Sequence, residues 1–448
     1  MTNREAADSR TASRSRVAAW ALWDCGATGV NAVVITFVFS VYLTEQVGAG
    51  LPGPTTPASW LGRVLTIAGL CVALLAPATG IWVDAPHRRR TALAVLTGLV
   101  VAMTSAMSLI RADYHYLWPG LILLACTAAC SDLATVPYNA MLRQLSTGQN
   151  SGRISGIGSA AGYFGSVLLL LIVYLGFVHG DGDKRGLLGL AASDGQHVRA
   201  AMLLAAAWFT LFALPLLVSV RTPAAVESRP VSGFLGAYRA LWDEVKREWR
   251  RDHNVVYYLL ASAVFRDGLT GIFAFGAVLG VTVYGVSQAD VLVFGVCACI
   301  VAAIGAVVGG QLDDRVGSKP VIIGSLTALV TVGLVLLILS GALAFWICGL
   351  LLCLFVGPTL ASARALMLRM SEEGKEGVAF GLYTTTGRAA SFLAPWMFFT
   401  FIDMFGTDRA GMGGLCVVLV AGLLAMLAVR VPQRGRPAAT APVETADL

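Results

Sequence analysis

The sequence predicts an all-α membrane protein with twelve transmembrane helices arranged as two six-helix halves. Of the 448 residues, 57% are hydrophobic and only 13% are charged, and the mean hydropathy is +0.74. Lipid offers no hydrogen-bond partner to the backbone, so a spanning helix needs about 20 mostly apolar residues, and segments of that kind recur along the whole chain. A hydrophilic segment near the middle divides them into two equal sets.

The first half is predicted at 18–220, after a polar N-terminal tail at 1–17. The first apolar run is too long for the apolar region of a signal peptide and lacks a clear cleavage site, so we expect it to be retained as the first helix. The six predicted spans of this half are 18–42, 59–83, 91–111, 116–139, 155–178 and 199–220.

The second half is predicted at 254–430 and is followed by a C-terminal tail at 431–448. It is joined to the first half by a linker at 221–253, whose stretch YRALWDEVKREWRRDHN is typical of a basic amphipathic helix on a membrane surface. The six predicted spans of this half are 254–284, 288–312, 320–341, 343–367, 377–403 and 411–430.

The distribution of Lys and Arg predicts the orientation. Most of them fall in the two tails, the linker and the alternate connections that share a side with the tails. Because cytoplasmic segments are enriched in basic residues, both termini are predicted to be cytoplasmic. This asymmetry accounts for the net charge of +6, so no nucleic-acid partner is expected.

The two halves carry a weak internal repeat. The predicted fifth span begins GRISGIGSAAGYFG and the eleventh begins GVAFGLYTTTGRAA, and the same interval separates Gly156 from Gly381 and Gly162 from Gly387. A short turn is also used twice, as GIWVDAPHRRR and as GQLDDRVGSKP. In each turn an aspartate, Asp84 or Asp314, follows a glycine by four residues and precedes basic residues.

The sequence contains no pattern that supports an enzyme. It has no P-loop signature, no nucleophile paired with a base, and no metal-ligand spacing. The nine cysteines form no CxxC pair, and most lie in apolar segments, as expected for small core residues. We therefore expect no catalysis, no cofactor and no bound metal.

Charged residues inside the predicted spans are the main candidates for function. A charge at the centre of the bilayer costs roughly 2.5 to 3.5 kcal/mol, so each one requires a partner or a water-filled cavity. In the stretch FRDGLTG, Arg266 lies about 22 Å along its helix, near the membrane midplane, and Asp267 is its neighbour. Arg388 lies about 16 Å along its helix from Gly377, and Asp132 lies at a similar depth to Arg388.

Asp24 and Arg364 are predicted to be shallower, within about two turns of the inner end of their helices. The spans then hold three carboxylates and three arginines, which permits internal pairing. Each of these residues has two interpretations: a structural ion pair, or the lining of a central cavity in which arginine binds an anionic group bidentately. The polar side chains of Asn31 and Tyr383 have two other interpretations: a hydrogen bond to a neighbouring helix, or contact with a substrate.

Several blocks of the chain together resemble one family. They are WALWDCGATGVNAVVITFVFSVYLTE, YNAMLRQL, GRISGIGSAAGYFGS, FRDG, GAVVGGQLDDRVGSK, FVGPTLASAR and FGLYTTTGRAASFLAP. The twelve spans and the repeated turn resemble the major facilitator superfamily. The blocks resemble, within it, the autophagy-related vacuolar effluxer family and its bacterial relatives.

The resemblance implies a secondary active transporter that works by alternating access. It implies export of a small polar or zwitterionic solute such as an amino acid, with protons as the candidate coupling ion. Substrate binding is expected at Arg266, Asp267, Arg388, Asp132, Asn31 and Tyr383. Proton coupling is expected at Asp24, Asp132 or Asp267. Gating of the conformational change is expected at Asp84, Arg88, Asp314 and Arg315.

The expected partners are the solute, protons and the lipid bilayer of the cell membrane, and we expect a monomer. Two alternatives remain open from the sequence. One is an exporter of amphipathic drugs or lipid-like metabolites, which the many aromatic and Met residues could accommodate. The other is a receptor or scaffold without transport activity, which would use the basic linker and tails as docking surfaces.

Overall fold

The structure is a computed structural model that describes residues 3–52, 54–180, 184–191, 193–219, 246 and 253–431. Most of the predicted amphipathic linker at 221–253 and most of the predicted C-terminal tail lie outside the described residues. Where it is described, the chain consists of helices and one two-stranded hairpin. This confirms the predicted all-α class.

The first half begins with a long helical segment that contains two π-helical stretches, and it ends with the helix that precedes the linker. Its helices are α1 (Asn3–Val30), η1 (Asn31–Phe37), α2 (Phe39–Tyr42), η2 (Leu43–Val47), α3 (Pro57–Val83), α4 (Pro86–Ala106), η3 (Met107–Leu109), η4 (Tyr114–Tyr116), α5 (Leu117–Ala140), α6 (Leu142–Leu145), α7 (Ser151–Val173), η5 (Tyr174–Val178), η6 (Ser193–Gly195) and α8 (Gln196–Ser219). The hairpin strands β1 (Lys184–Arg185) and β2 (Leu190–Ala191) lie between η5 and η6.

The second half consists of long helices joined by short turns. Its helices are α10 (His253–Thr282), α11 (Gln288–Val316), α12 (Ser318–Ile338), α13 (Ala342–Met370), α14 (Glu376–Ala390), α15 (Leu393–Phe405) and α16 (Ala410–Ala428).

Eleven helical segments in the described part of the chain are long and apolar enough to cross a membrane. The predicted eleventh span, 377–403, differs from the single helix expected there, because it is interrupted at Ser391 and Phe392 and forms α14 and α15. Pro395 is compatible with this break, because proline has no backbone N–H and fits best in the first turn of a helix, although Pro77, Pro137 and Pro358 lie inside continuous helices. A new helix that begins at Leu393 places Pro395 in its first turn.

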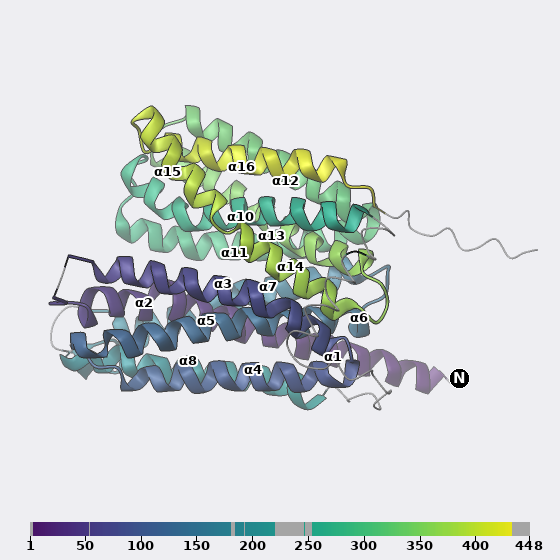
Figure 1. The fold of residues 1–448 in the computed structure, drawn as a ribbon, viewed down its shortest axis with the longest axis horizontal. Coiled ribbons are helices and arrows are strands. Elements are labelled where there is room, and N and C mark those ends of the chain that lie inside the picture. Colours follow the sequence, from purple (N-terminus) through teal and green to yellow (C-terminus); the bar gives the residue numbers. More distant parts are fainter. Residues whose placement is uncertain are drawn as a thin grey trace, which may run out of the picture.

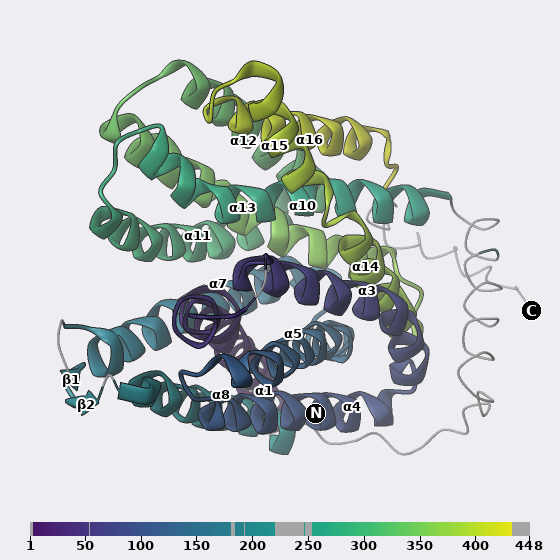
Figure 2. The ribbon, with the colours of Figure 1, turned by 60° about the vertical axis from the view of Figure 1, so that its left-hand side comes forward.

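The two halves lie side by side (Figure 1), with α1 to α8 in one bundle and α10 to α16 in the other. Across the interface α7 packs along α11, and α3 packs along α14. These are the fifth span on the eighth and the second span on the eleventh. Exchanging the two halves therefore converts one pair into the other, and Figure 2 shows both pairs at the contact between the bundles.

Glycines allow both pairs of helices to cross closely. A Cβ atom on Gly80 of α3 would overlap the backbone carbonyl of Gly377 at the start of α14. In the same way, a Cβ atom on Gly310 of α11 would overlap the carbonyl of Gly152 in α7. Small residues at such crossings let helix backbones approach each other, as in many membrane bundles.

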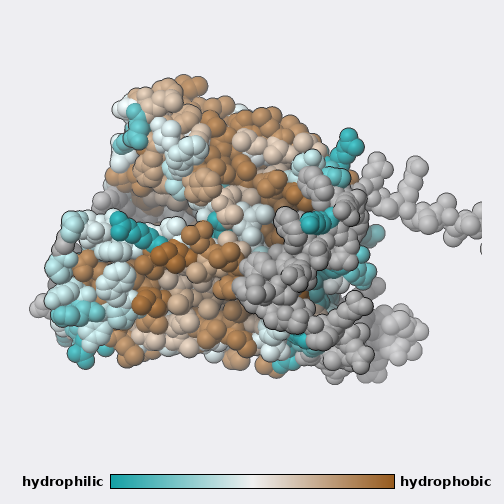
Figure 3. Space-filling view, in the orientation of Figure 1, coloured by the Kyte–Doolittle hydropathy of each residue, from teal (hydrophilic) through white to brown (hydrophobic). Residues whose placement is uncertain are grey.

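The bundle has two hydrophilic ends. We call the end at which α1 begins and α16 ends the terminal end, and the opposite end the distal end (Figure 1). Between them, hydrophobic side chains cover the visible outer surface of the helices in a broad belt (Figure 3). Large apolar side chains such as Leu70, Leu203, Ile304 and Leu424 are more than half exposed, as expected for a surface that faces lipid.

Candidate functional site

A polar cavity of about 120 Å³ lies between the two halves. Helices α1 and α5 of the first half form most of its wall, and Arg364 of α13 contributes from the second half. A dry cavity of about 150 Å³ can hold benzene, so this cavity has room for a solute of a few heavy atoms. Its lining residues are Trp23, Asp24, Ala27, Thr28, Asn31, Ser131, Thr135, Tyr138, Asn139 and Arg364.

Asp24 and Arg364 form an ion pair across the cavity, with 3.6 Å between Asp24 Oδ2 and Arg364 Nη1. The hydroxyl of Thr28 donates a hydrogen bond to Asp24 at 3.2 Å, and Arg364 donates to Ser159 at 3.1 Å. The guanidinium also lies 5.8 Å from the ring centre of Tyr138. The structure places both side chains in the cavity wall, where their ion pair joins the two halves.

Asp132 and Arg388 form a second ion pair between the halves, from α5 to α14. Their side chains are 20% and 41% exposed, so this pair is more open than the one between Asp24 and Arg364. Ser131, the neighbour of Asp132, donates a hydrogen bond to Asn31 Oδ1 at 3.0 Å. This hydrogen bond joins η1 to α5 within the cavity wall, and Asp132 follows Ser131 directly in the chain.

Arg266 lies against α14 within the second half. It donates a hydrogen bond to the carbonyl of Tyr383 at 3.0 Å, and its guanidinium lies 3.8 Å from the ring centre of that residue. A Cβ atom on Gly387 would lie only 3.0 Å from Arg266 Nη1, so the glycine makes room for the guanidinium. The stacking on Tyr383 is a cation–π contact, and it stabilises a charge that is partly removed from water.

Asp267 is 6% exposed and accepts a hydrogen bond from the backbone N–H of Ala394 at 2.5 Å. Ala394 is the second residue of α15, where backbone N–H groups lack partners within the helix. The carboxylate thus caps the helix that begins after the interruption at Ser391 and Phe392. Arg266 and Asp267 are adjacent in the chain but have different partners, because successive residues of a helix point about 100° apart.

At the terminal end, each repeated turn contacts a helix start in the opposite half. Asp84 Oδ1 accepts the backbone N–H of Val378 in α14 at 3.1 Å. Asp314 accepts the backbone N–H groups of Gly152 and Arg153 in α7 at 2.8 and 3.0 Å. The first turn of a helix has free N–H groups and a partial positive charge, so it is a favourable place for a carboxylate.

Glu376 joins the halves at the same end and was not among the residues that the sequence analysis selected. Its carboxylate pairs with Arg89 at 2.8 Å and with Arg143 at 3.0 Å, both from the first half. Its side chain is only 2% exposed. In the repeated turn that contains Asp84, Arg89 is therefore the arginine that pairs with Glu376. The sequence analysis had selected its neighbour, Arg88. An acidic residue in the first turn of a helix is common, so the sequence held no particular signal for Glu376.

Around the second turn, the arginine that pairs with Asp314 is Arg369 of α13, at 3.3 Å. Arg369 also pairs with Asp313, which is fully buried. Arg369, Asp313 and Asp314 all belong to the second half. The Arg369 pairs can thus persist when the halves separate, whereas the pairs made by Glu376 must break.

The pKa values of two carboxyl groups at this end are shifted in opposite directions. Burial raises the pKa of Asp84 to about 7, although the backbone N–H of Val378 and the charge of Arg89 act in the opposite direction. Burial also acts to raise the pKa of Glu376, but backbone hydrogen bonds and the Arg89 guanidinium outweigh it, so this pKa is lowered. Glu376 is therefore ionised at neutral pH, and Asp84 titrates near it.

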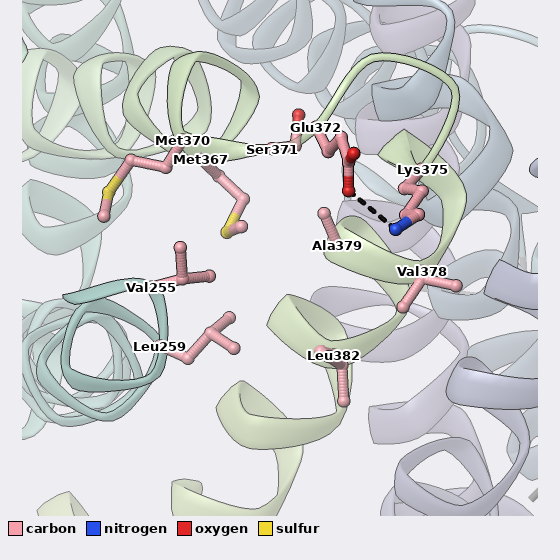
Figure 4. A pocket seen from close by; sticks show the side chains of 10 residues that line it. All are labelled: Val255, Leu259, Met367, Met370, Ser371, Glu372, Lys375, Val378, Ala379 and Leu382. Atoms are coloured by element: carbon pink, nitrogen blue, oxygen red, sulfur yellow. Dashed lines mark hydrogen bonds and ion pairs between the residues drawn. The ribbon is translucent and has the colours of Figure 1, made fainter. Parts of the chain in front are cut away.

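A smaller hollow of about 40 Å³ lies near the terminal end, between α10, α13 and α14 (Figure 4). Its walls are mainly apolar, and Glu372 and Lys375 form an ion pair of 2.6 Å at its edge. Its volume is about a third of that of the polar cavity, and its apolar walls offer few partners to a polar solute. None of the predicted site residues lines it.

Comparison with known proteins gives the family context. The family model "Vacuole effluxer Atg22 like" matches residues 140–440. The protein YxiO of Bacillus subtilis, described as an uncharacterized MFS-type transporter, is 22% identical over 407 residues, which cover 90% of this chain and 92% of that protein. Autophagy-related protein 22 of Cryptococcus neoformans is 24% identical over 361 residues, which cover 72% of this chain and 59% of the relative.

Solved structures of major facilitator superfamily transporters have the same fold. FucP in the outward conformation has a TM-score of 0.68 at 16% identity, and the match covers 93% of this chain and 100% of FucP. The proton:xylose symporter XylE, bound to 6-bromo-6-deoxy-D-glucose, has a TM-score of 0.70 at 15% identity, and the match covers 93% of this chain and 95% of XylE. These matches confirm the predicted fold class.

Proposed function

Because the chain belongs to the Atg22-like vacuole effluxer family and is a transporter of the major facilitator superfamily, we propose that it exports a small polar or zwitterionic solute, such as an amino acid, by alternating access. The observation that carries this proposal is the cavity between the halves, whose wall contains both a carboxylate and a guanidinium, Asp24 and Arg364. A zwitterion presents the two complementary charges.

We propose that the second ion pair, between Asp132 and Arg388, supplies further contacts with the solute, although neither residue lines this cavity in the structure. Arg388 has the more exposed guanidinium of the two pairs, and its planar fork suits a carboxylate. Asp132 would bind an ammonium group once the solute carboxylate has replaced it on Arg388. Asn31 and Tyr383 would complete the site with polar contacts, and Arg266 would add positive potential from behind Tyr383.

The size and polarity of the cavity favour a small polar solute over a large amphipathic drug. A drug-sized ligand needs a mostly apolar pocket of roughly 300 to 1,000 Å³. The cavity of about 120 Å³ is smaller and is lined by Asp24, Asn31, Thr28 and Arg364 among others. The sugar symporters FucP and XylE share the fold, so a sugar is the competing class of polar solute.

We further propose that the terminal end faces the cytoplasm of a cell whose plasma membrane holds the protein, because the basic residues concentrate on that side. The contacts of Asp84, Asp314 and Glu376 with the opposite half then close the cytoplasmic side. Export requires this side to open, so these contacts must break and re-form in each cycle. Asp24 or Asp132 would exchange protons when an ion pair between the halves separates.

Ligand-dependent thermal stability of the purified protein tests the proposed substrate class. A ligand that binds the folded state raises the unfolding temperature, by an amount that grows with its concentration relative to Kd. We expect a rise with one or more zwitterionic amino acids and no rise with their amides, which lack the carboxylate. Stabilisation by hexoses or by amphipathic cations alone would contradict the proposal.

A further inference from the structure

The loop between η5 and α8 carries an unusual pair of exposed leucines. Strands β1 and β2 form a short antiparallel hairpin, in which Lys184 is opposite Ala191. The turn between the strands is the sequence GLLG, and its two leucines, Leu187 and Leu188, are 84% and 63% exposed. They lie outside the helices that cross the membrane.

The backbone of this turn is firmly docked on the last residues of the fifth span. The N–H of Gly186 donates to the carbonyl of His179 at 2.7 Å, that of Leu187 to Leu175 at 2.9 Å, and that of Leu188 to Gly176 at 3.2 Å. Gly186 has φ 67°, and a Cβ atom there would overlap the backbone of Gly176. These contacts fix the backbone of the turn in a conformation that exposes both leucine side chains.

The level of the turn in the membrane follows from these hydrogen bonds. Leu175 lies about 36 Å from Ser151, the start of the span, at ~1.5 Å per residue. The hydrocarbon core is about 30 Å thick, and the bilayer with its headgroups is about 40 to 45 Å thick. Leu187 is bonded to Leu175, so it lies near the boundary between acyl chains and headgroups at the distal end.

The leucine pair also continues a surface that faces lipid. Leu171, Ile172, Tyr174 and Leu175 at the end of the fifth span are 37% to 46% exposed. The hairpin lies at the periphery of the bundle, beside the start of α8 (Figure 2). Lys184, which precedes the turn, is exposed, and a lysine beside an apolar surface can extend its ammonium group to the headgroup layer.

We infer that the GLLG turn is a lipid-docking element that re-enters the bilayer at the distal end. Leu187 and Leu188 insert among the acyl chains of phospholipids in that leaflet, and Lys184 reaches their phosphate groups. The apolar insertion removes the two leucines from water, and the charge fixes the depth of the hairpin. The turn thereby anchors the end of the fifth span, whose helix α7 packs against the second half.

Spin-label accessibility in bilayers tests this inference. The nine cysteines would be replaced by alanine, and a nitroxide attached at Leu187→Cys, or at Thr407→Cys in the exposed loop between α15 and α16 as a matched control at the same end. In phosphatidylcholine nanodiscs, the ratio of oxygen to nickel-chelate collisions should be higher at position 187 than at position 407, because oxygen partitions into the acyl layer and the chelate into water.

Tryptophan quenching is a second measurement that keeps the native cysteines. The additional fluorescence of Leu187→Trp should be quenched by brominated lipids, and that of Thr407→Trp should not. Equal, water-like values at the two positions in either measurement would overturn the inference. Because the nanodiscs contain no other protein, that outcome would show that the two leucines face water in the isolated protein and do not enter the bilayer.

Discussion

Asp84 and Asp314 have equivalent partners in opposite halves of the protein. Asp84 accepts a backbone N–H from the first residues of α14, and Asp314 accepts two from the first residues of α7. Each carboxylate thus lies at the positive end of a helix that belongs to the other half. The two ion pairs of Glu376, with Arg89 and Arg143, are added on the Asp84 side. The cytoplasmic closure that we propose therefore has two helix-start contacts and two ion pairs that share one buried carboxylate.

Glu376→Gln should open the terminal end. Removing one partner of a buried ion pair leaves charges unpaired and typically costs about 3 kcal/mol or more, which is over a hundredfold in a conformational equilibrium. Distances between spin labels placed across the terminal end would measure the shift. Glu372→Gln is the matched control. Its 2.6 Å ion pair with Lys375 is partly exposed and joins two residues of the same half, three positions apart. Similar distance distributions for both variants would argue against a closing role for Glu376.

Opening of the terminal end should increase with pH. In the closed state the pKa of Asp84 is raised to about 7, whereas in an open state this carboxyl faces water and has its ordinary pKa, near 4. The closed state therefore binds the proton more tightly and loses this advantage as the pH rises through 7. Between pH 6 and pH 8 the ratio of open to closed protein should rise about tenfold from this group alone.

Asp84→Asn should reduce this pH dependence, and it should change the transport rate more than the affinity. Asparagine retains an acceptor for Val378 but cannot titrate, and neither residue contacts the cavity. Because burial disfavours the ionised carboxylate in the closed state, the neutral asparagine should keep the protein about as closed at pH 8 as the native protein is at pH 6. Label distances across pH 6 to 8 and binding calorimetry would be compared with the native protein. An equal loss of affinity and rate would contradict a gating role.

Arg388→Lys should weaken solute binding about tenfold or more while changing thermal stability little. Its guanidinium is 41% exposed, and a lysine ammonium cannot reproduce bidentate contact with a carboxylate. Arg266→Lys serves as the comparison, because it removes the stacking on Tyr383 and should lower stability as well. Calorimetry and thermal unfolding on both variants separate these effects. Unchanged affinity in both would leave the two arginines with structural roles.

Asp267→Ala should destabilise the protein by about 1 kcal/mol, because the N–H of Ala394 loses its acceptor at the start of α15. Asp267→Asn keeps an acceptor oxygen and should retain both stability and transport. Thermal unfolding would be measured beside solute flux. If Asp267→Asn instead abolished proton-driven flux without loss of stability, Asp267 would be the coupling carboxylate.

The spans were predictable because lipid imposes a length and an apolar composition on each helix. Pro395 is compatible with the interruption of the predicted span 377–403, but it does not predict the break by itself, because Pro77, Pro137 and Pro358 lie inside continuous helices. The charges in the spans were identifiable individually, because each is costly in a membrane.

The pairing of those charges was not predictable from their depth along single helices. Asp24 is paired with Arg364, and Glu376 with Arg89 and Arg143, and in each case the partners come from different halves. Such contacts depend on how the halves rotate and pack against each other. Local sequence patterns do not contain that information. For the same reason, the contact of Asp84 with the backbone N–H of Val378 could not be predicted.

Solute flux in proteoliposomes tests the central claim most directly. Purified protein would be reconstituted with a radiolabelled amino acid that stabilises it, and flux would be followed with and without an imposed pH gradient. We predict movement of the amino acid above protein-free vesicles, faster when protons flow in the opposite direction, and loss of this flux in Arg388→Lys. Binding of the amino acid without any flux, under either condition, would contradict transport by alternating access and would favour a receptor.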